Sequence, residues 1–171
     1  MPARLLGATL VGIDAHPVQV EVDLSGGLPG IHLVGLPDSA VRESCLRVRA
    51  ALRNCGLPIP ARRITVNLAP AGLRKEGTAL DLPVAAGIVA AVQPFANPDA
   101  PGLLLAGEVA LDGSLRPVRG ALSMALLAKR LGLAGALLPV ESAPEAAAVR
   151  GLAVYPVGTL PEAFALLRAA P

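Results

Sequence analysis

The stretch "RKEGTALDLPVAAGIVAA" (residues 74–91) joins a charged, glycine-containing turn to a long apolar segment. Its second half predicts a largely buried helix over 80–93, with Pro83 in the first turn, where the missing N–H removes no hydrogen bond. Such turns often present a nucleophile at a helix N-terminus, where free backbone N–H groups can hold an oxyanion. The small residues at this point are Thr78 and Ala79. The stretch is therefore either an active site or only the surroundings of one.

The chain before this stretch predicts a β-rich half that contains one amphipathic helix. That helix should begin near Pro37, with Asp38 or Ser39 as its N-cap, and end at 54–56. Its expected buried stripe follows the helical period and consists of Val41, Cys45, Val48, Leu52 and Cys55. Strands are expected at 5–13, 17–24, 31–36 and 63–69, with the turn of the first hairpin at 14–17.

The chain after this stretch predicts alternating helices and strands. Asp112-Gly113 predicts a hairpin turn within 103–118, after a proline-rich surface connection at 93–102. Helices are expected within 119–133, 142–152 and 159–170, and short strands at 135–139 and 153–157. This order of elements predicts an α+β fold, a two-layer α/β sandwich.

The composition favours one domain that is not embedded in a membrane. The chain has 171 residues, 53% of them hydrophobic, which is enough for one domain with a substantial core. Glycine, proline or a charge interrupts every apolar run within about a dozen residues, which is too short for a membrane span. Cys45 and Cys55 lie about three helical turns apart and cannot form a disulfide. They are interpreted as reduced thiols, which favours a cytoplasmic location.

Charge is unevenly distributed along the chain. The segment from Arg42 to Lys75 contains eight basic residues and one acid, Glu43, and carries a net charge of +7. Because the whole chain carries +2, the remainder carries −5. A basic block of this kind can bind anions. It can equally be a solvated helix face paired with acids from elsewhere, and composition leaves both interpretations open.

Familiar motifs for nucleotides and metals are missing from the 171 residues. There is no Walker loop and no GxGxxG, and "SGGLPG" (25–30) lacks the Lys-Ser/Thr of an NTP site. His16 and His32 have no further histidine or cysteine at ligand spacing, so no metal site is predicted. Glu76 and Asp81 are five residues apart across a turn, which favours helix capping or arginine pairing over acid–base catalysis.

Long motifs before, within and after the stretch 74–91 resemble a known bacterial family. The run from "VGIDAHPVQV" (11–20) to "DLPVAAGI" (81–88), together with "LAGEVALDGSLRPVRGAL" (105–122), closely resembles the N-terminal domain of the Mg-chelatase-like ATPases of the ComM/YifB family. The resemblance covers essentially all of 1–171. It implies one N-terminal domain of a longer protein whose AAA+ module, together with its ATP and Mg, lies downstream. It also implies a hexameric DNA helicase that promotes branch migration in natural transformation, and it does not imply metal insertion.

The same domain is similar to the proteolytic domain of Lon-type proteases, a fold of the ribosomal-protein domain-2-like type. In that similarity Ala79 takes the position of the nucleophilic serine, within 76–79. Leu122 takes the position of the catalytic lysine, within 119–122. The resemblance therefore implies a vestigial catalytic pair and no enzyme activity in this domain, because neither side chain can attack or accept a proton.

The basic block and the resemblance together suggest an accessory domain that contacts DNA and helps to assemble a ring. The predicted nucleic-acid-binding residues are Arg42, Arg49, Arg53, Arg62, Arg63, Arg74 and Lys75. The segment contains no aromatic residue to stack on bases, so sequence-independent phosphate contacts are expected. One alternative is a purely structural oligomerisation domain. Another is an enzyme on the same fold, a kinase or a peptidase with a relocated nucleophile such as Thr78 or Ser123.

Overall fold

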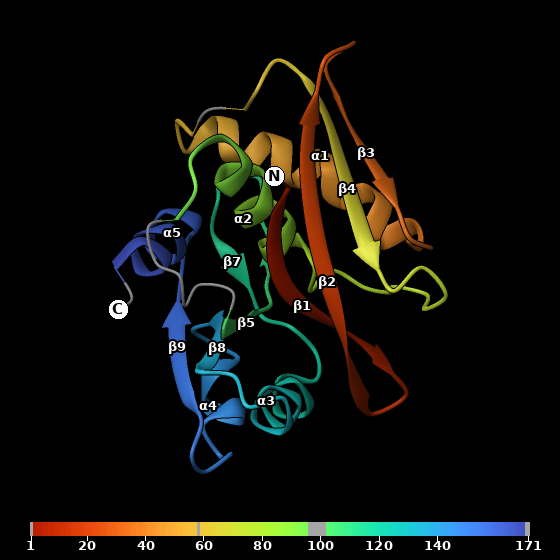
Figure 1. Cartoon of the computed structure of the whole chain (residues 1–171). Helices are drawn as coiled ribbons and strands as arrows, with labels where there is room; N and C mark the ends of the chain where they lie inside the picture. Colours follow the sequence, from red (N-terminus) through yellow and green to blue (C-terminus); the bar gives the residue numbers. More distant parts are fainter. Residues whose placement is uncertain (1, 58, 96–101, 170–171) are drawn as a thin grey trace.

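The computed structural model describes residues 2–57, 59–95 and 102–169, and it contains both helices and strands (Figure 1). The strands are β1 (Ala3–Val11), β2 (Asp14–Ser25), β3 (Gly30–Val34), β4 (Arg63–Ala69), β5 (Leu103–Leu105), β6 (Glu108–Val109), β7 (Leu115–Arg116), β8 (Gly135–Pro139) and β9 (Ala153–Val157). The helices are α1 (Ser39–Asn54), α2 (Asp81–Val92), α3 (Ala121–Arg130), α4 (Ala143–Ala146) and α5 (Leu160–Ala169). No helix in the described residues is long and apolar enough to cross a bilayer.

Seven strands form one mixed sheet in the order β3-β4-β2-β1-β5-β8-β9. The β1–β2 and β2–β4 pairs are antiparallel, whereas β3–β4, β1–β5, β5–β8 and β8–β9 are parallel. Strands β6 and β7 form a separate antiparallel ribbon. β3 and β9 are therefore the two edges of the main sheet, as Figure 1 shows.

Helices cover the two faces of this sheet unequally. Helices α1, α2 and α5 contribute Val48, Ile88 and Phe164 to a large apolar cluster with the inward side chains of β1, β2 and β4. Helix α3 and the segment after α4 form a second cluster with the opposite face of β5 and β8, around Met124 and Leu138. The expected α+β sandwich is confirmed. At β3 and β4 the fold has two layers, the sheet and the helices on one of its faces. At β5 and β8 helix α3 adds a third layer on the opposite face.

Most of the predicted elements agree with the structure. The first hairpin turn and the helix expected over 142–152 differ from it. Asp38 caps α1 as expected, since its carboxylate accepts a hydrogen bond of 2.7 Å from the N–H of Val41. The first hairpin turns at 12–13, where Gly12 has a φ of 64°. The expectation of a turn at 14–17 was therefore wrong. Pro17 lies in β2 where that strand has only β1 as a neighbour, and a proline is tolerated there.

The second half of the chain is close to its prediction. The Asp112-Gly113 turn is present between β6 and β7, and the side chain of Asp112 accepts a 2.9 Å hydrogen bond from the N–H of Ser114. The helix expected over 142–152 is only one turn long, because α4 ends at Ala146. Part of the proline-rich connection, 96–101, lies outside the described residues.

Candidate functional site

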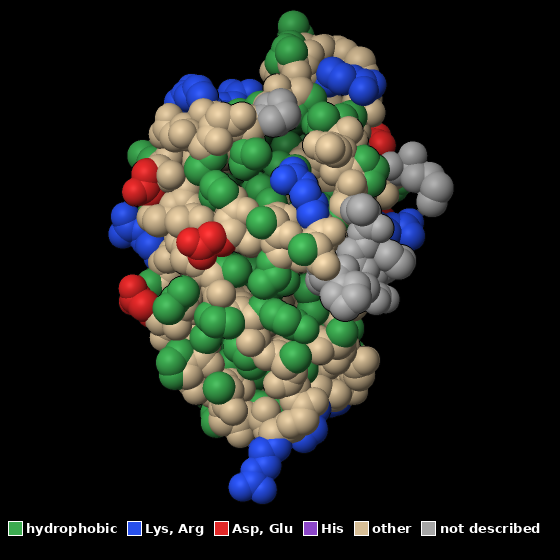
Figure 2. Space-filling model, turned by 90° about the vertical axis from the view of Figure 1, so that its left-hand side faces the viewer, with side chains coloured by type: hydrophobic (Ala, Val, Ile, Leu, Met, Phe, Trp, Pro, Cys, Tyr) green, Lys and Arg blue, Asp and Glu red, His purple; other side chains and the backbone are tan. Residues whose placement is uncertain are grey.

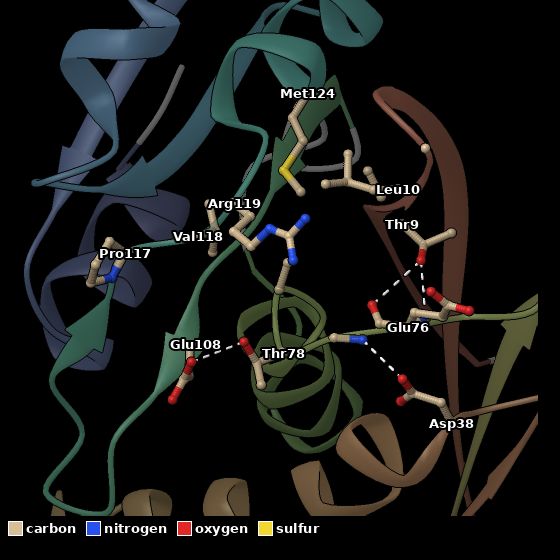
Figure 3. Close-up of a pocket in the computed structure, with 14 residues that line it drawn as sticks. Thr9, Leu10, Asp38, Glu76, Thr78, Glu108, Pro117, Val118, Arg119 and Met124 are labelled. Carbon is tan, nitrogen blue, oxygen red and sulfur yellow. Dashed lines mark hydrogen bonds between the residues drawn. The ribbon is translucent and has the colours of Figure 1, made fainter.

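A pocket of about 540 Å³ lies beside the turn at the start of the stretch 74–91 (Figure 3). Its walls come from five separate parts of the chain: β1 with the turn that follows it, the N-cap of α1, the turn before α2, Glu108 of β6, and the region of 117–119 and Met124. Ala79 lies on the wall contributed by the turn. The predicted turn therefore does border a cavity, and the cavity is large enough for a small ligand.

Three hydrogen-bonded groups fix the turn at the pocket. Asp38 caps α1 with one carboxylate oxygen, and its other oxygen accepts a 3.2 Å hydrogen bond from the N–H of Gly77. The hydroxyl of Thr9 in β1 accepts a 3.0 Å hydrogen bond from the N–H of Glu76. Thr78 donates a 2.9 Å hydrogen bond from its hydroxyl to the carboxylate of Glu108. The turn is thus held by β1, α1 and β6 together.

The structure brings only one of the two catalytic positions implied by the Lon-type resemblance to the pocket. Ala79 lines the pocket, whereas Leu122 is an exposed residue of α3 outside the lining, and its N–H donates to Glu145 at 3.3 Å. Ser123 is also turned away, because its hydroxyl donates to the carbonyl of Ile13 at 2.6 Å. Of the relocated hydroxyls considered from the sequence, only that of Thr78 lies on the pocket wall.

The outer face of α1 carries the basic stripe that the helical period predicted. Arg42, Arg49 and Arg53 are exposed, and none of them forms an ion pair with another described residue. Leu46 lies on the same stripe, four residues after Arg42, with 72% of its surface exposed. Sequence reasoning missed this leucine, although its spacing placed it among the arginines.

The other predicted contacts do not extend this stripe into one surface. Arg62 and Arg63 are exposed at the start of β4. The side chain of Arg63 faces away from α1, because the neighbouring Ile64 packs in the core beneath that helix. Arg74 follows the other end of β4, and the rise of a strand of this length places it roughly 20 Å from Arg63. Arg74 pairs with Glu76 at 3.5 Å.

Lys75 must be withdrawn from the predicted set of exposed cations. Its surface is fully buried, and its ammonium group donates a hydrogen bond to the carbonyl of Pro70. Burial lowers the pKa of this lysine below its ordinary value. Its backbone also bonds to Leu36 and Asp38, so Lys75 ties the turn to the start of α1.

Arg47, another member of the basic block, is part of a buried ion pair. Its guanidinium donates to both carboxylate oxygens of Asp81, at 2.7 and 2.9 Å. The Asp81 side chain is 1% exposed and also accepts a 3.1 Å hydrogen bond from the N–H of Val109. The hydrogen bonds that Arg47 donates to the carboxylate of Asp81 raise the pKa of Arg47 above its usual range. The interpretation of Asp81 as an arginine partner is confirmed.

The matching family model decides the identity of the chain. The model described as subunit ChlI of Mg-chelatase matches residues 20–142, which include α1, α2 and most of the pocket. The chain belongs to the Mg-chelatase-like ComM/YifB family. Despite the chelatase name, no group of three or more potential metal-ligating side chains occurs among the described residues of this family member.

Named relatives support this assignment. The chain is 44% identical over 165 residues to an uncharacterized protein of Mycobacterium tuberculosis, covering 96% of this chain and 33% of the relative. It is 47% identical over 122 residues to the uncharacterized protein YifB of Escherichia coli, covering 71% and 24%. It is 43% identical over 150 residues to the competence protein ComM of Haemophilus influenzae, covering 88% and 29%. The chain thus spans about a quarter to a third of the length of these relatives.

A weaker similarity connects the fold to Lon proteases. A Lon protease of Mycolicibacterium smegmatis is 24% identical over 151 residues, which is 85% of this chain and 19% of that protein. This similarity agrees with the observed α+β sandwich.

Proposed function

We propose that the chain is a non-catalytic accessory domain of a ComM-type hexameric AAA+ DNA helicase that acts in branch migration. In this proposal the domain contacts the DNA backbone without sequence preference and helps to assemble the ring in the cytoplasm. ATP and Mg belong to an ATPase module elsewhere in the full-length protein. The methyl side chain of Ala79 on the pocket wall supports the non-catalytic part. Detectable turnover of a fluorogenic peptide would contradict it.

The free cations on α1 carry the DNA part of this proposal. Arg42, Arg49 and Arg53 project from one helix, and the first and last of them are separated by 11 helical steps, a rise of about 16 Å. They lack acidic partners among the described residues, so phosphates can approach all three without breaking an ion pair. Each phosphate neutralised by such a cation releases a condensed counterion, and the affinity then falls with salt.

The double variant Arg49→Ala/Arg53→Ala is expected to bind duplex DNA more weakly and with less dependence on salt. Each lost phosphate contact should reduce the slope of log affinity against log salt by about 0.9, so the slope should fall by about 2. Fluorescence anisotropy with a labelled duplex at several salt concentrations measures this. Two duplexes of unrelated sequence should give the same values.

Two controls separate this effect from loss of charge or of fold. Arg130→Ala/Arg150→Ala removes the same charge from exposed positions outside the basic block and should leave the slope nearly unchanged. Lys75→Met should also keep the slope, because a buried ammonium cannot reach a phosphate. An unchanged slope for the α1 variant, or an equal fall for the Arg130/Arg150 variant, would remove α1 from the DNA contact.

Leu46 favours a second candidate function, a purely structural role in ring assembly. A leucine that is 72% exposed among arginines suits the surface of a neighbouring subunit better than a phosphate backbone. Figure 2 shows a further apolar region, where hydrophobic side chains spread over the face on the side of α5 and β9. Assembly through the surface around Leu46 would let the arginines of α1 pair with acids of the neighbour.

The variant Leu46→Gln is expected to distinguish the two roles. A contact with a neighbouring subunit predicts smaller assemblies in analytical ultracentrifugation and an unchanged salt slope for DNA. Unchanged assembly together with reduced DNA affinity would instead place Leu46 in the DNA contact. Ile13→Gln supplies a control, since Ile13 is 85% exposed at the β1–β2 turn, where its carbonyl accepts a hydrogen bond from Ser123 of α3 and not from α1.

A further inference from the structure

The walls of the pocket carry more negative than positive charge. Asp38, Glu76 and Glu108 line it, and Arg119 is the one cation among the lining residues that the structure describes. Figure 3 shows their side chains arranged around the same cavity, with Thr78 beside Glu108. The rest of the wall combines the hydroxyls of Thr9 and Thr78 and exposed backbone with the apolar side chains of Ala8, Leu10, Ala79, Val118 and Met124. Apolar walls strengthen the field of such charges within a concave site.

These carboxylates differ in how far the protein already satisfies them. Both oxygens of Asp38 accept backbone N–H groups, so this residue is mainly structural. Glu76 makes only a 3.5 Å pair with Arg74, and both side chains are more than half exposed, so the pair is weak. Glu108 is half-buried and accepts a hydrogen bond only from the neutral hydroxyl of Thr78 among the described residues.

Glu108 is therefore a partly desolvated carboxylate on the pocket wall with no cation at ion-pair distance in the described part of the chain. Arg119, the cation of the same pocket, forms no ion pair with Glu108 or with another described carboxylate. A carboxylate in such a setting gains most from a charge-assisted hydrogen bond with a cation that enters the cavity. The net negative charge of the lining residues repels anions, so the pocket disfavours phosphates and nucleotides.

We propose that this pocket binds the lysine or arginine side chain of a polypeptide segment, with Glu108 as its counter-charge. An aliphatic stem that ends in a cation matches an apolar wall beside a carboxylate, because Lys and Arg bury their stems while the charged end finds a partner. The volume of about 540 Å³ also leaves room for residues that flank the basic one. This inference does not depend on the proposed DNA contact, which concerns the outer face of α1.

The probe for this site is the pentapeptide acetyl-Ala-Leu-Arg-Leu-Ala-amide, titrated into the chain by calorimetry at low salt. Replacing its arginine with citrulline, which is nearly isosteric and neutral, should weaken binding at least tenfold. The variant Glu108→Gln should weaken binding of the arginine peptide by a similar factor. Arg119→Gln should strengthen it several-fold, because it removes the opposing charge. A variant that merely loosened the fold would not move affinity in these two opposite directions.

Control measurements define what would overturn the proposal. Glu141→Gln removes an exposed carboxylate outside the pocket lining and should leave binding unchanged. Equal affinity for the citrulline peptide, no response to Glu108→Gln, or no binding of the arginine peptide at millimolar concentration would each reject the site. Agmatine, a free guanidinium compound, should bind more weakly than the peptide. Equal binding of agmatine would reject the polypeptide as the ligand.

Discussion

Replacing Asp81 with alanine should lower the free energy of unfolding by about 3–5 kcal/mol, because it removes one partner of a buried ion pair. The guanidinium of Arg47 is only 18% exposed and would lose both of its short hydrogen bonds to Asp81. The N–H of Val109 would lose its acceptor as well. Urea denaturation followed by circular dichroism measures the change, and the midpoint should shift with little change in slope.

Glu43 provides a matched control on the same arginine. It lies 3.6 Å from the guanidinium of Arg47, but its side chain is 68% exposed. The variant Glu43→Ala should therefore cost at most about 0.5 kcal/mol, as expected for an exposed pair one helical turn apart. Similar losses for Asp81→Ala and Glu43→Ala would show that burial does not set the strength of the Asp81 pair. Asp81→Asn should fall between the two variants, because it keeps an acceptor and loses the charge.

The local elements of this fold were predictable because their signals are contained in short windows of sequence. The bounds of β4, Arg63–Ala69, follow directly from the alternation in "RITVNLA". Helix α1 and its cap at Asp38 follow from the helical period and from the preference for aspartate at an N-cap. The first hairpin was misplaced because Pro17 is a strong turn signal, whereas a proline is also compatible with a strand that has a single neighbour.

The site was less predictable because its contacts join distant parts of the chain. Arg47 and Asp81 are 34 residues apart, and no periodicity reveals that they meet. Lys75 stands between Arg74 and Glu76, both exposed, so its burial could not be read from its neighbours in sequence. Glu108 reaches the pocket only because β6 lies beside the start of α2, where Thr78 donates to it. The turn was recognised from sequence, but the charge of the cavity beside it was not.

Replacing Gly35 with alanine should cost about 3–5 kcal/mol of unfolding free energy and is the most damaging small substitution that we expect outside the apolar core. Gly35 follows β3 with a φ of 108°, a conformation that side chains rarely adopt. An added Cβ would also lie far inside contact distance of the carbonyl of Leu68 in β4, and backbone atoms of a paired strand cannot move aside. Backbone strain and overpacking each contribute about 1–3 kcal/mol in such cases.

Gly56→Ala is the control for Gly35→Ala, because Gly56 has a φ of 69° and nothing lies within 4 Å of an added Cβ. It should cost only about 1–2 kcal/mol, the price of a left-handed conformation alone. Gly35→Ala should in addition weaken the pocket, since the segment from Gly35 leads to Asp38, whose carboxylate holds the N–H of Gly77. Amide hydrogen exchange at 75–79 should then accelerate in Gly35→Ala and stay unchanged in Gly56→Ala. Equal losses of stability in the two variants would show that the contact with Leu68 relaxes, and that the positive φ is the whole cost.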